Sequence, residues 1–320
     1  MKIIITGAAG FVGSNLTNAL LAQNHQVIGI DNLSYGLMRN IEFFLSNKNF
    51  SFIQGDLKDP SILSSVKGDA IVHLASQKIP RYTSAYITLE ENSVLLKNVV
   101  KKCLSDKIKL VFASTSDIYG KNPDIPYNEN SNILLGPTTV KRWAYAISKI
   151  YSEQFIIANN AEFGLEYTIM RFFGSYGTNQ NLTWWGGPQS VFIANALKNL
   201  PMEIHGDGLQ TRTFTYIEDT IQGVIKCIFE TNSKNEIFNV ANNPDEEISI
   251  LELGKLIWGL VNGNNSEPLI NFIPYQTFGN YEDVRRRVPD ISKIKKLLNY
   301  NPKFSLAKGM IKTIDWQKSL

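Results

Sequence analysis

The chain has few of the residues that build metal centres and disulfide frameworks, since only two of its 320 residues are cysteine and three are histidine. Cys103 and Cys227 do not have the spacing of metal ligands, and we expect buried free thiols of a reducing compartment. His73 lies inside an apolar stretch and is expected to be a core residue, while His25 and His205 are isolated from it in sequence. The sequence therefore predicts no metal site and no hydrolase constellation.

Strong charge and long apolar runs are also missing. A formal net charge of +3 is too small to indicate a nucleic-acid partner. No stretch has 18 uninterrupted apolar residues or resembles a cleavable signal, so we expect no membrane span and a cytoplasmic location. The composition, 43% hydrophobic and 19% charged, is ordinary for a globular protein that is long enough for a large core and a smaller lobe.

The N-terminus has the pattern of a strand, a glycine turn and a helix. Residues 1–6 form a short apolar run, and a helical pattern begins after Gly10. Gly7 permits a tight turn, Gly10 lets the backbone approach a pyrophosphate, and Gly13 allows the helix to pack closely on the strand. The pattern predicts a dinucleotide site at the helix N-terminus.

A second predicted strand ends at Asp31, where dinucleotide-binding folds place the acid that hydrogen-bonds the adenosine ribose. A carboxylate there repels the extra phosphate of NADP, so NAD is the expected cofactor. The alternative is a capping or turn aspartate. The predicted sheet strands cover residues 1–6, 26–30, 51–57, 69–76, 109–115, 166–173 and 236–241.

Tyr145 and Lys149 are spaced by four residues, which places both side chains on one face of a helix. An ammonium held near a phenol favours the phenolate, so Tyr145 is a candidate base for a substrate alcohol near neutral pH. The alternative is a half-buried tyrosine beside a solvated lysine.

Together with these features, five ordered motifs make the chain resemble an extended short-chain dehydrogenase/reductase of the nucleotide-sugar epimerase/dehydratase family. They are TGAAGFVG at residues 6–13, GDL at 55–57, STSDIYG at 114–120, YAISK at 145–149 and GDGLQTRTFTYIED at 206–219. The resemblance covers almost the whole chain.

The resemblance implies an α/β fold with a Rossmann-like doubly wound parallel sheet and a smaller C-terminal substrate-binding lobe. Residues 1–173 would form the NAD-binding domain, with a return strand near 236–241, and residues 174–320 mainly the nucleotide-sugar lobe. Such enzymes commonly form homodimers. The implied NAD-binding residues are Gly7, Gly10, Phe11, Val12, Gly13, Asp31, Asn32, Asp56, Leu57, Leu74, Ala75, Tyr145 and Lys149.

In that family, C4 of a nucleotide-linked sugar is oxidised, the 4-keto sugar reacts, and hydride usually returns. By position, Thr115 would hold the C4 hydroxyl, Tyr145 would take its proton, and Lys149 would bind the nicotinamide ribose. Arg212 and an arginine from 285–287 would bind the diphosphate, for which a planar guanidinium fork is suited. UDP is the expected nucleotide.

Other expected substrate contacts have open alternatives. Lys78 and Arg81 follow a predicted strand end and either face the pocket or lie on the surface. Trp184 and Trp185 either stack on a base and cover the sugar, or fill the lobe interface. Gly174 stands where the family usually has an asparagine that contacts the substrate.

The triplet Thr115-Ser116-Asp117 bears on the reaction that follows oxidation. The family's dehydratases typically have Thr-Asp-Glu, and Ser116 lacks that acid. The family's UDP-glucuronate decarboxylases typically have Thr-Ser-Glu and an arginine two residues before a proline, the position of Arg287 here. Asp117 is one methylene shorter than that glutamate and would otherwise only orient a loop.

We therefore expect decarboxylation of a UDP-hexuronate, with 4-epimerisation almost equally favoured and dehydration third. Epimerisation needs no carboxylate after Thr115. Two further hypotheses stay open at this point, a regulator that binds NAD without catalysis and a sugar reductase that releases its cofactor.

Overall fold

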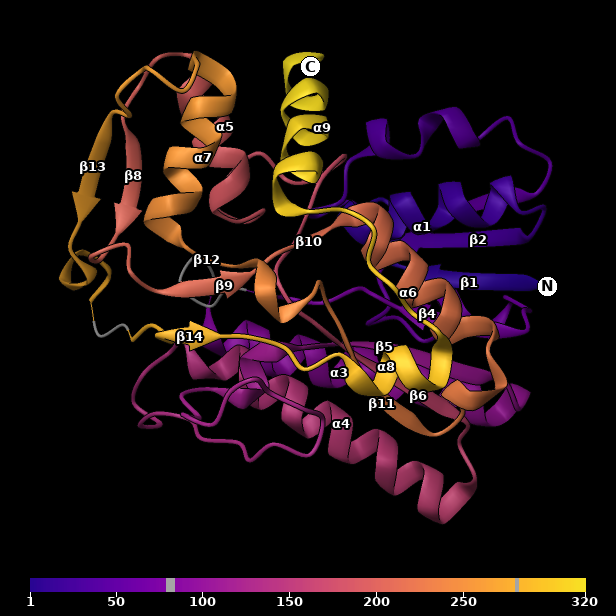
Figure 1. Cartoon of the computed structure of the whole chain (residues 1–320). Coiled ribbons are helices and arrows are strands. Elements are labelled where there is room, and N and C mark those ends of the chain that lie inside the picture. Colours follow the sequence, from indigo (N-terminus) through magenta and orange to yellow (C-terminus); the bar gives the residue numbers. More distant parts are fainter. Residues whose placement is uncertain (79–83, 280–281) are drawn as a thin grey trace.

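The computed structural model describes residues 1–78, 84–279 and 282–320, and a seven-stranded sheet runs through its centre (Figure 1). The strand order is β11-β6-β5-β4-β1-β2-β3, and every neighbouring pair is parallel. The strands are β1 (Lys2–Thr6), β2 (Gln26–Asp31), β3 (Phe50–Gln54), β4 (Ala70–His73), β5 (Lys109–Thr115), β6 (Tyr167–Phe172) and β11 (Glu236–Val240). Each of the seven predicted strands is present, with ends that differ from the predicted ones by a few residues at most.

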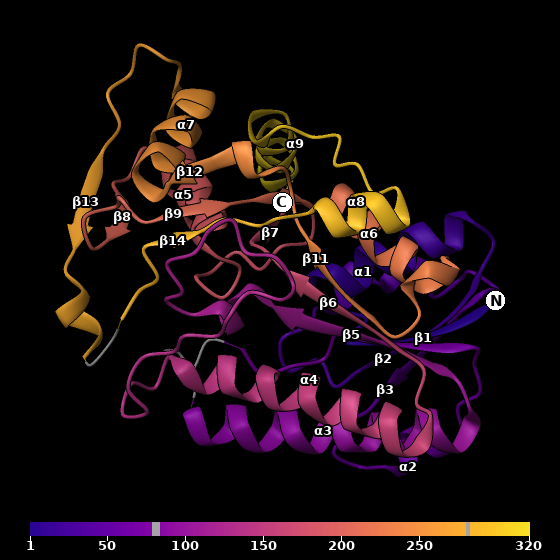
Figure 2. The same cartoon turned by 60° about the horizontal axis from the view of Figure 1, so that its bottom comes forward.

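Helices cover both faces of this sheet, which confirms the doubly wound α/β fold (Figure 2). One face carries α1 (Phe11–Ala22), α6 (Ile217–Phe229) and α8 (Ser292–Leu298), and the other carries α2 (Ser61–Ser64), α3 (Ala85–Asp106) and α4 (Trp143–Phe163). Successive side chains of β1 explain the two layers, because Ile3 and Ile5 belong to one buried apolar cluster and Ile4 to the other.

The smaller lobe is made mostly from residues after 174, although β11 leaves it and pairs with β6 in the main sheet. Its helices are α5 (Pro188–Leu197), α7 (Ile250–Asn262) and α9 (Leu306–Lys318). Its strands are β7 (Ser175–Tyr176), β8 (Met202–His205), β9 (Thr211–Thr213), β10 (Thr215–Tyr216), β12 (Glu247–Ser249), β13 (Ile270–Ile273) and β14 (Arg286–Arg287). The division at residue 173 stays a prediction.

Short 3-10 helices connect several of these elements. They are η1 (Met38–Asn40), η2 (Glu42–Phe44), η3 (Ser116–Tyr119), η4 (Thr231–Ser233), η5 (Pro244–Glu246) and η6 (Tyr275–Phe278). In the described ranges, no helix has the length and apolar character that crossing a membrane requires.

Both cysteines and His73 lie in the core. Cys103 and Cys227 are buried free thiols, as expected. The Nδ1 atom of His73 lies 2.7 Å from the Thr6 hydroxyl, and burial lowers the pKa of His73 to about 3. His73 is therefore a neutral core residue, which also confirms its expected role.

Candidate active site

A cavity of about 600 Å³ opens where the parallel strands end and extends into the smaller lobe. The carboxyl ends of β1, β2, β4 and β5 meet at this edge, because parallel strands point the same way. The predicted site residues within the described ranges line the cavity, with Arg285 as the exception. Arg81 lies outside the described residues.

Arg285 lies at the surface, where its Nη1 atom donates to both carboxylate oxygens of Asp207 at 2.8 and 2.9 Å. Its side chain is 59% exposed, against 14% for Arg287. Arg286 is also exposed and pairs with Glu247, so of the three arginines at 285–287 only Arg287 lines the cavity.

The glycine turn forms a cradle for a dinucleotide. A Cβ on Gly13 would lie 2.1 Å from the Gly7 carbonyl oxygen, so a side chain there cannot be accommodated. Gly7 has φ +75°, which favours glycine. The N-cap residue Gly10 supplies no side-chain cap, and the first turn of α1 has no acid. No side chain at the N-cap and no acid in the first turn of α1 therefore competes with a pyrophosphate for the positive end of this helix.

Asp31 is held at the end of β2 with its carboxylate at the cavity. Its Oδ2 accepts from the Ala9 N–H at 3.0 Å and its Oδ1 from the Leu33 N–H at 2.8 Å. Burial raises the pKa of Asp31, and these two bonds oppose that rise. Each carboxylate oxygen still has a lone pair for a ribose hydroxyl.

Thr115, Tyr145 and Lys149 come together from the end of β5 and the first turns of α4. Thr115 hydrogen-bonds Tyr145, and the Lys149 ammonium donates to the Ala113 carbonyl at 2.8 Å. Burial lowers the pKa of Lys149 to about 7, with nearby Glu153 opposing that change. The three candidates for C4 chemistry therefore share one wall of the cavity.

The electrostatics of this pair differ from the sequence-based expectation. Burial and then the charge of Asp117 raise the pKa of Tyr145, while its bond to Thr115 opposes them. Lys149 does not offset this, because its ammonium is turned to Ala113 and lies 5.8 Å from the centre of the Tyr145 ring. Sharing a helical face brought the two residues close but did not favour the phenolate.

Three arginines and two aspartates that line the same cavity form an ion-pair cluster. Oδ1 of Asp117 lies 2.6 Å from Arg287 and 3.1 Å from Arg142. Oδ1 of Asp283 lies 2.8 Å from Arg212 and 3.6 Å from Arg142. Arg142 thus joins the two carboxylates, and we call these five residues the arginine cluster.

The charges of the cluster keep both acids ionised. Burial opposes ionisation, yet Arg287, Arg142 and Arg212 hold the pKa of Asp117 below its usual range. Despite burial, Arg212 and Arg142 likewise lower the pKa of Asp283 to about 2. Three guanidinium groups against two carboxylates leave a net positive charge, which suits an anionic ligand.

Sequence reasoning missed Arg142 and Asp283 as site residues. Arg142 precedes Tyr145 by three positions and so shares its helical face, a signal that could have identified it. Asp283 pairs with Arg212 across 71 residues of sequence, and its local sequence gives no sign of that contact. Burial also lowers the pKa of Lys78 to about 8, although Asp117 opposes this shift.

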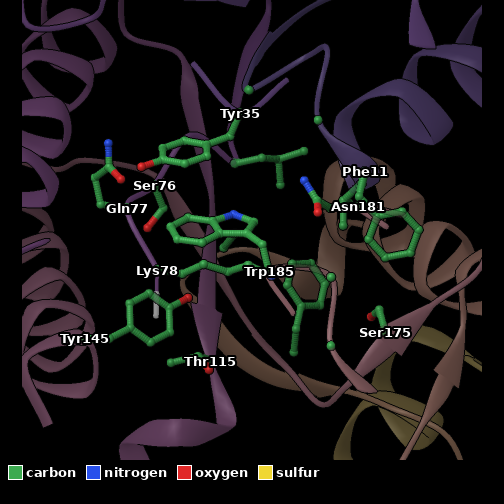
Figure 3. Close-up of a pocket in the computed structure, with 18 of the residues that line it drawn as sticks. Phe11, Tyr35, Ser76, Gln77, Lys78, Thr115, Tyr145, Ser175, Asn181 and Trp185 are labelled. Carbon is green, nitrogen blue, oxygen red and sulfur yellow. The ribbon is translucent and has the colours of Figure 1, made fainter. Parts of the chain in front are cut away.

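The two tryptophans have different surroundings. Trp184 stacks on His205 with ring centres 4.2 Å apart, so it packs inside the smaller lobe. Trp185 stacks on Tyr35, and Figure 3 shows its indole between Tyr35 and the side chains of Lys78 and Tyr145. Gly174 has φ +43°, and a Cβ there would approach a Phe214 ring carbon to 2.9 Å.

Comparisons with known proteins agree with this geometry. Residues 3–241 match the model of the NAD dependent epimerase/dehydratase family. The chain belongs to this family. UDP-N-acetyl-alpha-D-glucosaminuronate decarboxylase of Bacillus cytotoxicus is 30% identical over 100% of this chain and 98% of its own. UDP-glucuronic acid decarboxylase 1 of Danio rerio is 34% identical over 98% of this chain and 72% of its own.

Among solved structures, the UDP-glucuronic acid 4-epimerase from Bacillus cereus, in complex with UDP-glucuronic acid and NAD, is also similar to this family member. Its TM-score is 0.87 at 27% identity, with coverage of 100% of this chain and 99% of that one. The epimerase/dehydratase assignment confirms the expected enzyme class and the expected cofactor, NAD. A regulator without catalysis finds no support in these relatives.

Proposed function

We propose that the protein is an NAD-dependent decarboxylase of a UDP-linked hexuronate. The observation that carries this proposal is the position of Arg287, which faces the same cavity as Thr115 and Tyr145. Its Nε–H is buried and has no hydrogen-bond partner among the described residues. A buried donor of this kind is available to an acceptor from a ligand or from an ordered water. The two decarboxylase relatives, which are similar over 98% or more of this chain, add support.

The first step is oxidation at C4 of the sugar. Thr115 binds the C4 hydroxyl, and Tyr145 accepts its proton while hydride leaves C4. Bound NAD would supply the hydride acceptor and a positive charge that favours the phenolate. Gly7, Gly10 and Gly13 would give its pyrophosphate access to the backbone, and Asp31 would accept from its ribose.

The second step is loss of CO₂ from the 4-keto uronate. The C5–C6 bond breaks, its electron pair enters the enolate spanning C5, C4 and the C4 oxygen, and CO₂ leaves. Arg287 then donates a proton to C5. Burial lowers the pKa of Arg287, although Asp117 opposes that shift, so its proton is easier to give than that of an exposed arginine. Asp117 positions this guanidinium.

A 4-epimerase is the second candidate function. The similar Bacillus cereus structure is a UDP-glucuronic acid 4-epimerase, and rotation of a keto sugar needs no residue beyond those that carry out oxidation. In that case Arg287 and Arg142 would only bind the substrate. Dehydration is less favoured because Ser116 supplies no acid.

The test is incubation of the protein and NAD⁺ with UDP-glucuronate, UDP-N-acetylglucosaminuronate, UDP-glucose, UDP-N-acetylglucosamine and dTDP-glucose, followed by mass spectrometry. Loss of CO₂ from a uronate supports decarboxylation, and a product of unchanged mass with altered retention establishes epimerisation instead. Arg287→Ala should slow formation of the decarboxylated sugar about a hundredfold or more, because protonation of C5 loses its acid. Arg285→Ala is the matched control, because this neighbour lies at the surface, and it should act like the wild type.

We also propose a homodimer that forms through α3 and α4. Support comes from large apolar side chains that these helices expose, namely Tyr86, Ile87, Leu89, Ile147 and Tyr151. Light scattering on the purified protein tests this, and Tyr151→Glu should give a monomer. A monomeric wild type would contradict the proposal. The cytoplasmic location stays a prediction.

A further inference from the structure

The loop between β7 and α5 is fastened at its base to the helix that follows the glycine turn. The Asn15 side chain donates to the Thr178 carbonyl at 2.9 Å, and the Asn179 side chain donates to the Ser14 hydroxyl at 3.1 Å. Both partners on α1 lie within the first turns of that helix. The loop therefore starts beside the pyrophosphate cradle, although it belongs to the smaller lobe.

Hydrogen bonds within the loop fix the direction of Trp185. Asn181 accepts from the Thr183 N–H at 2.9 Å, and the Thr183 hydroxyl accepts from the Trp185 N–H at 3.2 Å. A Cβ on Gly186 would lie 1.9 Å from the Asn181 carbonyl oxygen, so only glycine allows this closure. The conformation of the loop, and with it the position of Trp185, is therefore fixed by the loop's own hydrogen bonds and by Gly186.

The partner ring, Tyr35, is held by the cofactor side of the cavity. Asp31 accepts from the Leu33 N–H, which shapes the turn that leads to Tyr35. A Cβ on Gly36 would lie 2.7 Å from an Asp31 carboxylate oxygen. This segment therefore packs directly against Asp31, the residue expected to bind the ribose. Tyr35, from the segment after β2, and Trp185, from the loop before α5, therefore meet in the cavity that both line.

We propose that Tyr35 and Trp185 form an aromatic clasp that keeps NAD bound between turnovers. Their ring centres are 4.4 Å apart and their planes differ by 6°, a stacked arrangement. The loop runs from its base on α1 to this stack, and in the proposed clasp a dinucleotide on the cradle leaves only after the stack opens. Retention matters because loss of reduced cofactor would leave the keto sugar without its hydride donor.

The clasp does not depend on which reaction follows oxidation, so its test uses no sugar nucleotide. Labelled NAD⁺ is bound to the full-length protein, excess unlabelled NAD⁺ is added, and the bound label is followed over time. Tyr35→Ala and Trp185→Ala should each release label about tenfold faster than the wild type. The double variant should release it no faster than either single variant, because one contact has been removed in all three.

Trp185→Phe retains a ring and should release NAD⁺ at nearly the wild-type rate. Phe163→Ala removes an exposed aromatic at the end of α4 and is the control. Tyr35 is 42% exposed, so Tyr35→Ala carries the test even where Trp185→Ala fails to fold. Wild-type release by Tyr35→Ala, or a double variant whose effect is the product of the two singles, would overturn the clasp.

Discussion

On the cofactor side of the cavity, backbone atoms define the site, whereas on the arginine side long charged side chains define it. Gly7 and Gly13 are required because an added Cβ would meet backbone atoms at 2.9 Å or less. Arg142, Arg212 and Arg287 instead reach their two carboxylates from separate elements. The first side should be intolerant of added volume, and the second should be intolerant of a lost charge.

Tyr145 lies between the cofactor side and the arginine side. Because its hydroxyl is the proposed general base, removing it should have the largest effect on activity. Tyr145→Phe should lower kcat roughly a thousandfold, because the general base is lost while the ring remains. NAD affinity should change little, since the cradle is untouched. Mass spectrometry of the product measures kcat, and calorimetry measures the affinity for NAD. Tyr151→Phe, on the same helix but 40% exposed, is the control, and equal activity in both variants would remove Tyr145 from the mechanism.

Removing one charge tests the arginine side. Asp283→Asn should lower the free energy of unfolding at pH 7 by about 3 kcal/mol, because it leaves three buried guanidinium groups with one carboxylate. The folded pKa of Asp283 is about 2 against an ordinary 3.8. Its stabilisation is therefore full above about pH 4 and is lost as the pH falls towards 2, so the two proteins should converge there.

Denaturant unfolding from pH 7 to pH 2 follows this convergence. Asp207→Asn removes an exposed partner of Arg285 and should change the unfolding free energy by less than about 0.5 kcal/mol. A constant difference between wild type and Asp283→Asn at every pH would mean that the lost hydrogen-bond acceptor, and not the lost charge, destabilises the variant.

The same contrast decides how much of the site could be predicted from the sequence. The strand, glycine turn and helix are contiguous, so Gly7, Gly10 and Gly13 could be identified from spacing, as could the strands that end at the cavity. Asp31 could be identified for the same reason. These positions depend on local backbone geometry, which a short sequence specifies.

Contacts between distant residues could not be predicted in this way. Asp283 meets Arg212, and Trp185 meets Tyr35, only because the smaller lobe folds back over the sheet edge. The environment of Tyr145 also depends on tertiary structure, since burial and the turn of Lys149 towards Ala113 override the effect expected from their spacing. Spacing predicts which side chains share a face, but it does not predict desolvation.

Added volume tests the cofactor side. Gly13→Ala should cost about 2 kcal/mol of unfolding free energy and weaken NAD binding, because its Cβ would press on the Gly7 carbonyl and the Ala8 backbone. Gly254→Ala is the matched control. Its Cβ would meet side chains at 3.5 Å or more inside α7, where alanine is the better helix former. A loss of unfolding free energy in Gly13→Ala no larger than that in Gly254→Ala would mean that the cradle can relax.

Gly174 is constrained both by its backbone conformation and by packing. Its substitution should have the smallest effect of these predictions on the unfolding free energy. Gly174→Ala should lower the free energy of unfolding by about 1.5 kcal/mol. Part of this loss comes from the φ of +43° and part from contact of the added Cβ with Phe214. Gly164→Ala should cost about 1 kcal/mol, because φ is +71° there but no atom lies within 4 Å of the added Cβ. Thermal unfolding measures both. Restoring space with Phe214→Leu should bring Gly174→Ala down to the cost of Gly164→Ala, because only the backbone term would remain. If Phe214→Leu leaves the cost of Gly174→Ala unchanged, the ring does not limit this position, and the family's asparagine should be accepted here as readily as alanine.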